Sequence, residues 1–97
     1  MTKVELIKLL ATETGQTQAV VGDVVSAMLR VTMETVAAGK PVLLPGFGAF
    51  KPSARAARTG KNPATGAALD IPATTIPRFT AGLAFKNLVK AGAELED

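Results

Sequence analysis

The spacing of apolar residues predicts two helices in the first part of the chain. From Val4 to Ala11, apolar residues recur at intervals of three and four, the period of one helix face. The segment Thr2–Glu5 fits a capping box, and Gly15 supplies a stop. A first helix is therefore expected over about residues 3–13.

A second periodic segment opens at the N-cap candidate Thr17 and ends at Gly39. Its apolar residues cover roughly half of a helical circumference or more. One short preceding helix cannot cover so wide a face, so a sheet with a third helix, or a second copy of the chain, must cover the rest. Its β-branched residues would also suit strands, but the periodicity and the caps favour a helix.

After the second helix, the pattern predicts short strands and then a stretch with few residues that could form a core. Pro41–Leu44 reads as a strand, and a second strand begins at Gly48 after a Pro-Gly turn. From Lys51 to Thr75 the chain is poor in large apolar residues and rich in Ala, Arg, Thr, Gly and Pro. This stretch is either a disordered loop or a two-stranded ribbon that projects from the body.

The centre of this stretch favours the ribbon. Asn62–Gly66 has strong turn chemistry, because its proline fixes φ and its glycine allows positive φ. Arg58–Lys61 precedes the turn, and Ala67–Ile71 follows it. After the return through Phe79, a last amphipathic helix is expected over about residues 81–91.

Composition limits the size of the core and the available chemistry. The 97 residues suit one modest domain, for which self-association would add burial. There is no cysteine or histidine, and the carboxylates show no convergent spacing, so we expect no enzyme activity, metal, cofactor or small-molecule substrate. No apolar run approaches the roughly 20 residues of a membrane span. We expect a soluble, intracellular protein, with its four phenylalanines as the large core residues: Phe47, Phe50, Phe79 and Phe85.

The charge is unevenly distributed along the chain. Residues 1–50 carry as many acidic as basic side chains, whereas residues 51–90 carry seven basic side chains against Asp70 alone. This contrast indicates a neutral scaffold with a polyanion-binding surface, although a merely solvated basic face would look the same. A basic hairpin with small side chains suits a groove of duplex DNA, and Pro63 at its tip is a rigid wedge for a base step.

A joined motif extends from the second strand to the turn. It comprises Gly46–Phe50, then Arg55, then Ala57–Gly66. This motif closely resembles that of the bacterial histone-like HU and integration host factor family. The resemblance covers about residues 1–90, including the helix lengths and the return through Phe79.

The resemblance implies an α+β fold that forms an intertwined dimer. Each chain would contribute two N-terminal helices, a three-stranded antiparallel sheet with an extended β-ribbon arm, and a short C-terminal helix. The expected parts of the single domain are a helical dimerisation part (1–40), a sheet (41–80) with its arm at about 52–75, the last helix (81–91) and an acidic tail (92–97). The dimer core would contain Met28, Leu29, Val36, Leu44, Phe47, Phe50 and Phe79.

The resemblance also implies a cytoplasmic, nucleoid-associated protein that binds double-stranded DNA and bends it. Two arms would embrace the minor groove, and Pro63 would intercalate. The partner chain would be a second copy, with a heterodimer left open. The expected DNA-binding residues are Lys3, Arg55, Arg58, Thr59, Gly60, Lys61, Asn62, Pro63, Arg78 and Lys86.

The sequence departs from the family pattern on the returning strand of the arm. Ala67, Ala68 and Asp70 occupy a strand that usually carries lysines, and Leu83 stands where the last helix often has a basic residue. Fewer cations predict weaker binding and a shallower salt dependence. Arg78, in contrast, adds a charge where a small residue is common.

Three functions remain open at this point. The first is largely sequence-independent binding and bending of DNA, and the second is site-specific bending like that of integration host factor. The third is a protein-interaction module that has lost its affinity for nucleic acid. The individual residues also have plainer interpretations: Pro63 as a turn former only, and Arg55 and Arg58 as solvated residues at a strand edge.

Overall fold

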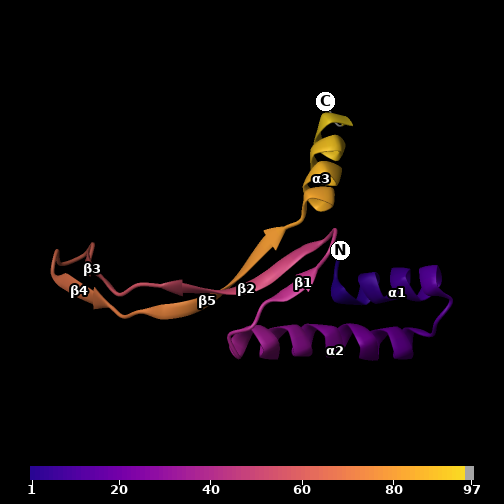
Figure 1. The fold of residues 1–97 in the computed structure, drawn as a ribbon, viewed down its shortest axis with the longest axis horizontal. Coiled ribbons are helices and arrows are strands. Elements are labelled where there is room, and N and C mark those ends of the chain that lie inside the picture. Colours follow the sequence, from indigo (N-terminus) through magenta and orange to yellow (C-terminus); the bar gives the residue numbers. More distant parts are fainter. Residues whose placement is uncertain (96–97) are drawn as a thin grey trace. The chain divides into compact units, whose positions relative to one another are not determined.

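The computed structural model describes residues 1–95 and the side chains of residues 1–92. The chain divides into two compact units, Met1–Glu34 and the residues from Thr35 onward. Figure 1 shows the elements in chain order: α1 Lys3–Thr14, α2 Gln18–Ala37, β1 Val42–Leu44, β2 Gly48–Arg55, β3 Arg58–Lys61, β4 Ala68–Ile71, β5 Thr74–Ala81 and α3 Leu83–Leu95.

The two N-terminal helices begin and end at the expected caps. The Thr2 hydroxyl accepts a hydrogen bond from the Glu5 amide, and Gly15 follows α1 in the left-handed conformation with φ of 70°. The Thr17 hydroxyl accepts from the Val20 amide at 3.2 Å and so caps α2. Side chains that satisfy free amides at a helix start stabilise it, typically by about 1 kcal/mol.

The core of the first unit is small. Ala11 of α1 and Val21 and Val25 of α2 are buried, with Ile7 and Leu10 packed against them. Val36 near the end of α2 is also buried, but most of the large apolar residues of α2 remain exposed, including Met28 (54%) and Met33 (67%). Therefore α1 leaves much of the apolar surface of α2 uncovered, as the width of that surface predicted.

The second unit is built on a three-stranded antiparallel sheet in the order β1-β2-β5. The long ladder between β2 and β5 runs from the pair Gly48–Ala81 to the pair Arg55–Thr74. Gly48 is required by space, because a Cβ there would lie 2.6 Å from the Phe79 ring and 2.6 Å from the Thr80 carbonyl oxygen.

The four phenylalanines form one aromatic cluster in this unit. Phe79 lies at its centre, with ring centroids 4.8 Å from Phe50, 5.4 Å from Phe47 and 6.3 Å from Phe85. The single chain does not bury the cluster, since Phe47 is 47% exposed and Phe79 40% exposed. Within residues 1–92 these two rings therefore remain partly exposed, and their place in a dimer core stays a prediction.

The segment from Lys51 to Thr75 is a ribbon and not a disordered loop. Strands β3 and β4 pair antiparallel, from Arg58–Ile71 to Lys61–Ala68, in the same register as the ladder between β2 and β5. The pairing stops only over residues 56–57 and 72–73. Pro72 lies in this break, and it has no N–H to donate to a ladder. One hairpin thus extends from the sheet to the tip (Figure 1).

The last helix differs from its expected bounds of 81–91. Ala81 ends β5, the Gly82 amide donates to the Phe47 carbonyl oxygen at 2.8 Å, and α3 begins at Leu83. The helix continues to Leu95, since neither Ala91 nor Gly92 imposes a stop. Part of the expected acidic tail is therefore helical, while Glu96 and Asp97 lie outside the described residues.

Candidate nucleic-acid interface

The ribbon ends in a turn held by main-chain hydrogen bonds. The Asn62 amide donates to the Ala67 carbonyl oxygen at 2.8 Å, and the Gly66 amide donates to the Asn62 carbonyl oxygen at 2.7 Å. Gly66 has φ of 72°, a conformation that costs other L-residues about 1–2 kcal/mol. The sequence predicted this turn correctly, because its chemistry is local.

Side chains brace the same turn around Pro63. The Asn62 Oδ1 accepts a hydrogen bond from the Ala64 amide at 2.8 Å, which closes an Asx turn over Pro63. The Thr65 hydroxyl accepts from the Ala67 amide at 3.3 Å. Pro63 itself is exposed. The turn therefore presents the proline ring to solvent on a restrained backbone, and Asn62 has a structural role beyond the expected DNA contact.

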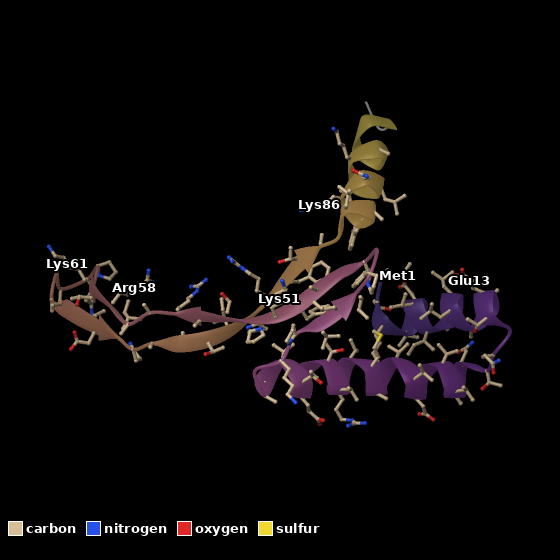
Figure 2. All side chains as sticks on the ribbon, viewed as in Figure 1. Met1, Glu13, Lys51, Arg58, Lys61 and Lys86 are labelled. Atoms are coloured by element: carbon tan, nitrogen blue, oxygen red, sulfur yellow. The ribbon has the colours of Figure 1, made fainter. Side chains whose placement is uncertain are left out.

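The strand that leads to the tip carries the exposed cations of the arm. Arg55, Arg58 and Lys61 are all exposed, and none of them has an ion pair within residues 1–92. The ion pair found among those side chains joins Arg30 and Glu34 on α2 at 3.6 Å. In Figure 2 Arg58 and Lys61 lie toward the far end of the ribbon. These cations are free to meet an external anion.

Pairing in the outer ladder distributes the predicted site residues over both faces of the ribbon. Thr59 stands opposite Asp70, and Lys61 shares their face. Arg58 stands opposite Ile71 on the other face. Gly60 follows Arg58 on that face, where an added Cβ would lie 3.3 Å from the Ile71 Cδ1. Gly60 thus leaves room for the Ile71 side chain on that face.

The remaining predicted contacts lie outside the arm. Arg78 is exposed on β5, and Lys86 is exposed on α3. Lys3 belongs to the first unit, where its Nζ donates to the Ser26 hydroxyl at 3.0 Å. Sequence reasoning gave Lys51 no role, yet β2 places it directly opposite Arg78.

The residues expected in a dimer core are mostly uncovered in one chain. Val36 is buried and Phe50 is half-buried. The other members are exposed: Met28, Leu29, Leu44, Phe47 and Phe79. No helix among the described residues is long and apolar enough to cross a membrane, and those residues contain no acidic cluster that could hold a metal ion.

These features define a class of protein: a small α+β scaffold that presents a cationic β-ribbon to a polyanion. The sequence profile described as bacterial DNA-binding protein matches residues 1–90. The chain therefore belongs to this family, which includes the HU proteins. The family is defined by DNA binding and not by a catalysed reaction.

Individual relatives agree over nearly the whole chain. The DNA-binding protein HU of Staphylococcus aureus is 42% identical over 90 residues, which cover 93% of this chain and 100% of the relative. The DNA-binding protein HU-1 of Halalkalibacterium halodurans is 44% identical over 90 residues, with the same coverage. The solved structure of an Anabaena HU–DNA cocrystal matches with a TM-score of 0.85 at 39% identity, covering 92% of this chain and 97% of that chain. The expected fold and family are confirmed.

Proposed function

We propose that this protein binds duplex DNA as a homodimer, with little sequence preference, and bends it by inserting Pro63 at a base step. The observation that carries the proposal is the exposed Pro63 on a braced turn, at the end of a ribbon whose cations have no ion pairs within residues 1–92. A solved relative described as an HU–DNA cocrystal supports DNA as the polyanion.

Affinity would come from phosphate contacts made by the ribbon. Each phosphate that Arg55, Arg58 or Lys61 neutralises releases condensed counterions. Each contact should therefore add about 0.9 to the steepness with which log affinity falls as log salt rises. Gly60 adds no side chain beside Ile71, and the side chains at the tip are small. These features favour entry into the minor groove, with the cations reaching the phosphates along its edges.

Weak sequence preference follows from the chemistry of the tip. The Asn62 Oδ1 already accepts from the Ala64 amide, which restrains this side chain and leaves one lone pair and the NH2 group for contact with a base. Pro63 and Ala64 have no side-chain hydrogen-bonding groups. The minor groove itself offers a degenerate pattern that separates mainly A·T from G·C pairs. We therefore expect discrimination by the deformability of the DNA more than by base identity.

Bending would follow from the wedge. Inserting an apolar side chain unstacks a base step at a cost of a few kcal/mol, which is recovered when the bent duplex contacts more of the protein. The proline ring must keep its position while the base step is unstacked. The two main-chain hydrogen bonds of the tip and the Asx turn at Asn62 supply that restraint.

Dimerisation would complete the molecule. Met28 and Met33 on α2, and Phe47 and Phe79 in the aromatic cluster, are large apolar side chains left exposed by one chain. Burying such a side chain contributes about 1.5–3 kcal/mol. A second copy supplies the matching apolar surface and a second arm, so that the duplex is held from two sides.

The bend angle tests the wedge. We expect Pro63→Ala to keep affinity within about tenfold and to reduce the bend, measured by FRET between the ends of a labelled duplex. Pro72→Ala is the matched control, because Pro72 is exposed in the same ribbon but away from the tip. A bend angle that Pro63→Ala leaves unchanged would refute the wedge.

Titration and competition test the remaining parts of the proposal. The wild-type chain should bind short duplexes at low salt, and a lack of binding there would overturn DNA binding itself. Competition of a labelled bent site against bulk genomic DNA measures specificity. If the labelled site binds about a thousandfold or more tightly than genomic DNA does, sequence-independent binding is wrong and site-specific bending is the function.

A further inference from the structure

Lys51 and Arg78 stand directly opposite each other in the three-stranded sheet. Lys51 lies on β2 and Arg78 on β5, and the register of these strands pairs them. Directly opposed residues share one face of a sheet, with Cβ atoms about 5 Å apart. Like charges in this arrangement repel each other and destabilise the sheet.

Nothing in the surrounding sheet neutralises this pair. Strands β1, β2 and β5 contain no Asp or Glu. On the same face, the flanking cross-strand pairs are Ala49–Thr80 and Ser53–Ile76, which are uncharged. Both cationic side chains are exposed, and neither has an ion pair within residues 1–92. The folded protein thus retains a repulsive pair that a single substitution could remove.

The pair lies on the sheet face opposite the aromatic cluster. Side chains alternate along a strand, so Phe50 and Phe79 project from one face, and Lys51 and Arg78 from the other. Arg55 follows four residues after Lys51 on the same strand and shares its face. At about 3.3 Å per residue, Arg55 is about 13 Å further along. Cations therefore continue from the ribbon onto the sheet (Figure 2 labels Lys51 there).

A phosphate group suits two adjacent cations of these kinds. The planar guanidinium of Arg78 can donate two parallel hydrogen bonds to phosphate oxygens, and the ammonium of Lys51 acts as a point charge. A bound phosphate between them would convert their repulsion into two attractions. Phosphates of one DNA strand recur about every 3.4 Å along the axis, so a duplex lying along this face would bring one within reach.

We propose that Lys51 and Arg78 form a two-cation site for a backbone phosphate of DNA, which extends the contact from the arm onto the sheet. The inference rests on the proposed DNA-binding function and adds a site to it. In this site Arg78 acts together with Lys51 and not as an isolated contact. The site also offsets the missing cations of β4, whose only charged residue is Asp70.

The salt dependence of binding measures this contact. A plot of log affinity against log salt has a negative slope. In a dimer, the double variant Lys51→Gln with Arg78→Gln should make this slope less steep by about two, one for each protomer. The double variant Lys8→Gln with Lys40→Gln removes the same net charge from exposed positions outside the arm and the sheet, and should leave the slope within about half a unit.

A charge reversal separates this role from a structural one. Lys51→Glu creates an opposite-charge pair with Arg78, so it should raise the melting temperature of the DNA-free protein while weakening DNA binding about tenfold or more at low salt. Opposite signs in the two measurements support the phosphate site. Unchanged binding, or a loss of both stability and binding, would overturn it.

The arm variant Arg58→Ala distinguishes failure of this site from failure of the proposed function. If Arg58→Ala lowers the salt slope and the Lys51 and Arg78 variants do not, the two-cation site is wrong and DNA binding by the arm stands. If the lysine control lowers the slope as much as the double variant does, net charge explains the effect and the site is also wrong. If the wild-type chain binds no duplex at low salt, both proposals fail.

Discussion

The inner and outer parts of the hairpin share one register but have different chemistry. The inner ladder, between β2 and β5, includes the Phe50–Phe79 pair, and Gly48 lies tightly against Phe79. The outer ladder, between β3 and β4, has no aromatic pair, and only Gly60 and Ile71 in it are half-buried. The continuous register lets packing at the inner end orient an outer end that has almost no core of its own.

This difference separates the contribution of the aromatic face of the inner ladder, which is to stability, from that of the outer ladder, which is to binding. Local opening requires little free energy where few apolar contacts are broken, and more where a core is disrupted. Substitutions that disturb the aromatic face of the inner ladder should therefore change global unfolding, whereas substitutions in the outer ladder should change DNA binding and leave unfolding nearly unchanged.

The largest effect is expected for Gly48→Ala in the inner ladder. The new Cβ would lie 2.6 Å from both the Phe79 ring and the Thr80 carbonyl oxygen, so the ladder or the cluster must shift. We expect a loss of about 2–3 kcal/mol in the free energy of unfolding, measured by denaturant titration. Gly92→Ala is the control, because an added Cβ there meets no atom within 4 Å and alanine favours the helix. Equal effects of the two substitutions would contradict close packing at Gly48.

The sequence predicted features that depend on neighbours in the chain. The caps at Thr2 and Thr17 and the turn at Asn62 arise from residues within five positions of one another, so their residue types are sufficient. The ribbon and the family were both predicted from the joined motif that ends in this turn. The charges were predicted only in part. The sequence showed the excess of cations, but it did not show which cations stand opposite each other on neighbouring strands.

What the sequence left undetermined depends on residues far apart in the chain. The opposition of Lys51 and Arg78 follows from a strand register that joins positions 27 residues apart. The 40% exposure of Phe79 depends on which distant segments pack against its ring, and its neighbours in the chain do not determine that. The C-terminal helix runs past its expected end because no residue there forbids a helix, and such an absence gives no sequence signal.

A smaller and local effect is expected for Asn62→Ala at the tip. The substitution removes the acceptor of the Ala64 amide, which contributes about 1 kcal/mol to the closed turn. We expect faster hydrogen exchange at Ala64 and Gly66, a reduced DNA bend and an unchanged melting temperature. Thr65→Val removes a longer hydrogen bond of the same turn, at 3.3 Å, and should have a weaker effect. A fall in melting temperature would show that the tip and the inner ladder unfold as one unit.

The smallest effect is expected for Asp70→Asn on the returning strand. Asp70 is the acidic residue among the exposed cations of the arm, so its removal should strengthen binding by less than about 1 kcal/mol, or a few-fold, at low salt. Because mobile ions screen exposed charges over about 10 Å at 0.1 M, the gain should shrink as salt is added. Asp23→Asn makes the same change at an exposed position on α2 and should leave affinity unaltered. A gain shared by both variants would mean that net charge, and not the arm, sets the affinity; a gain confined to Asp70→Asn would locate the DNA at the outer ladder.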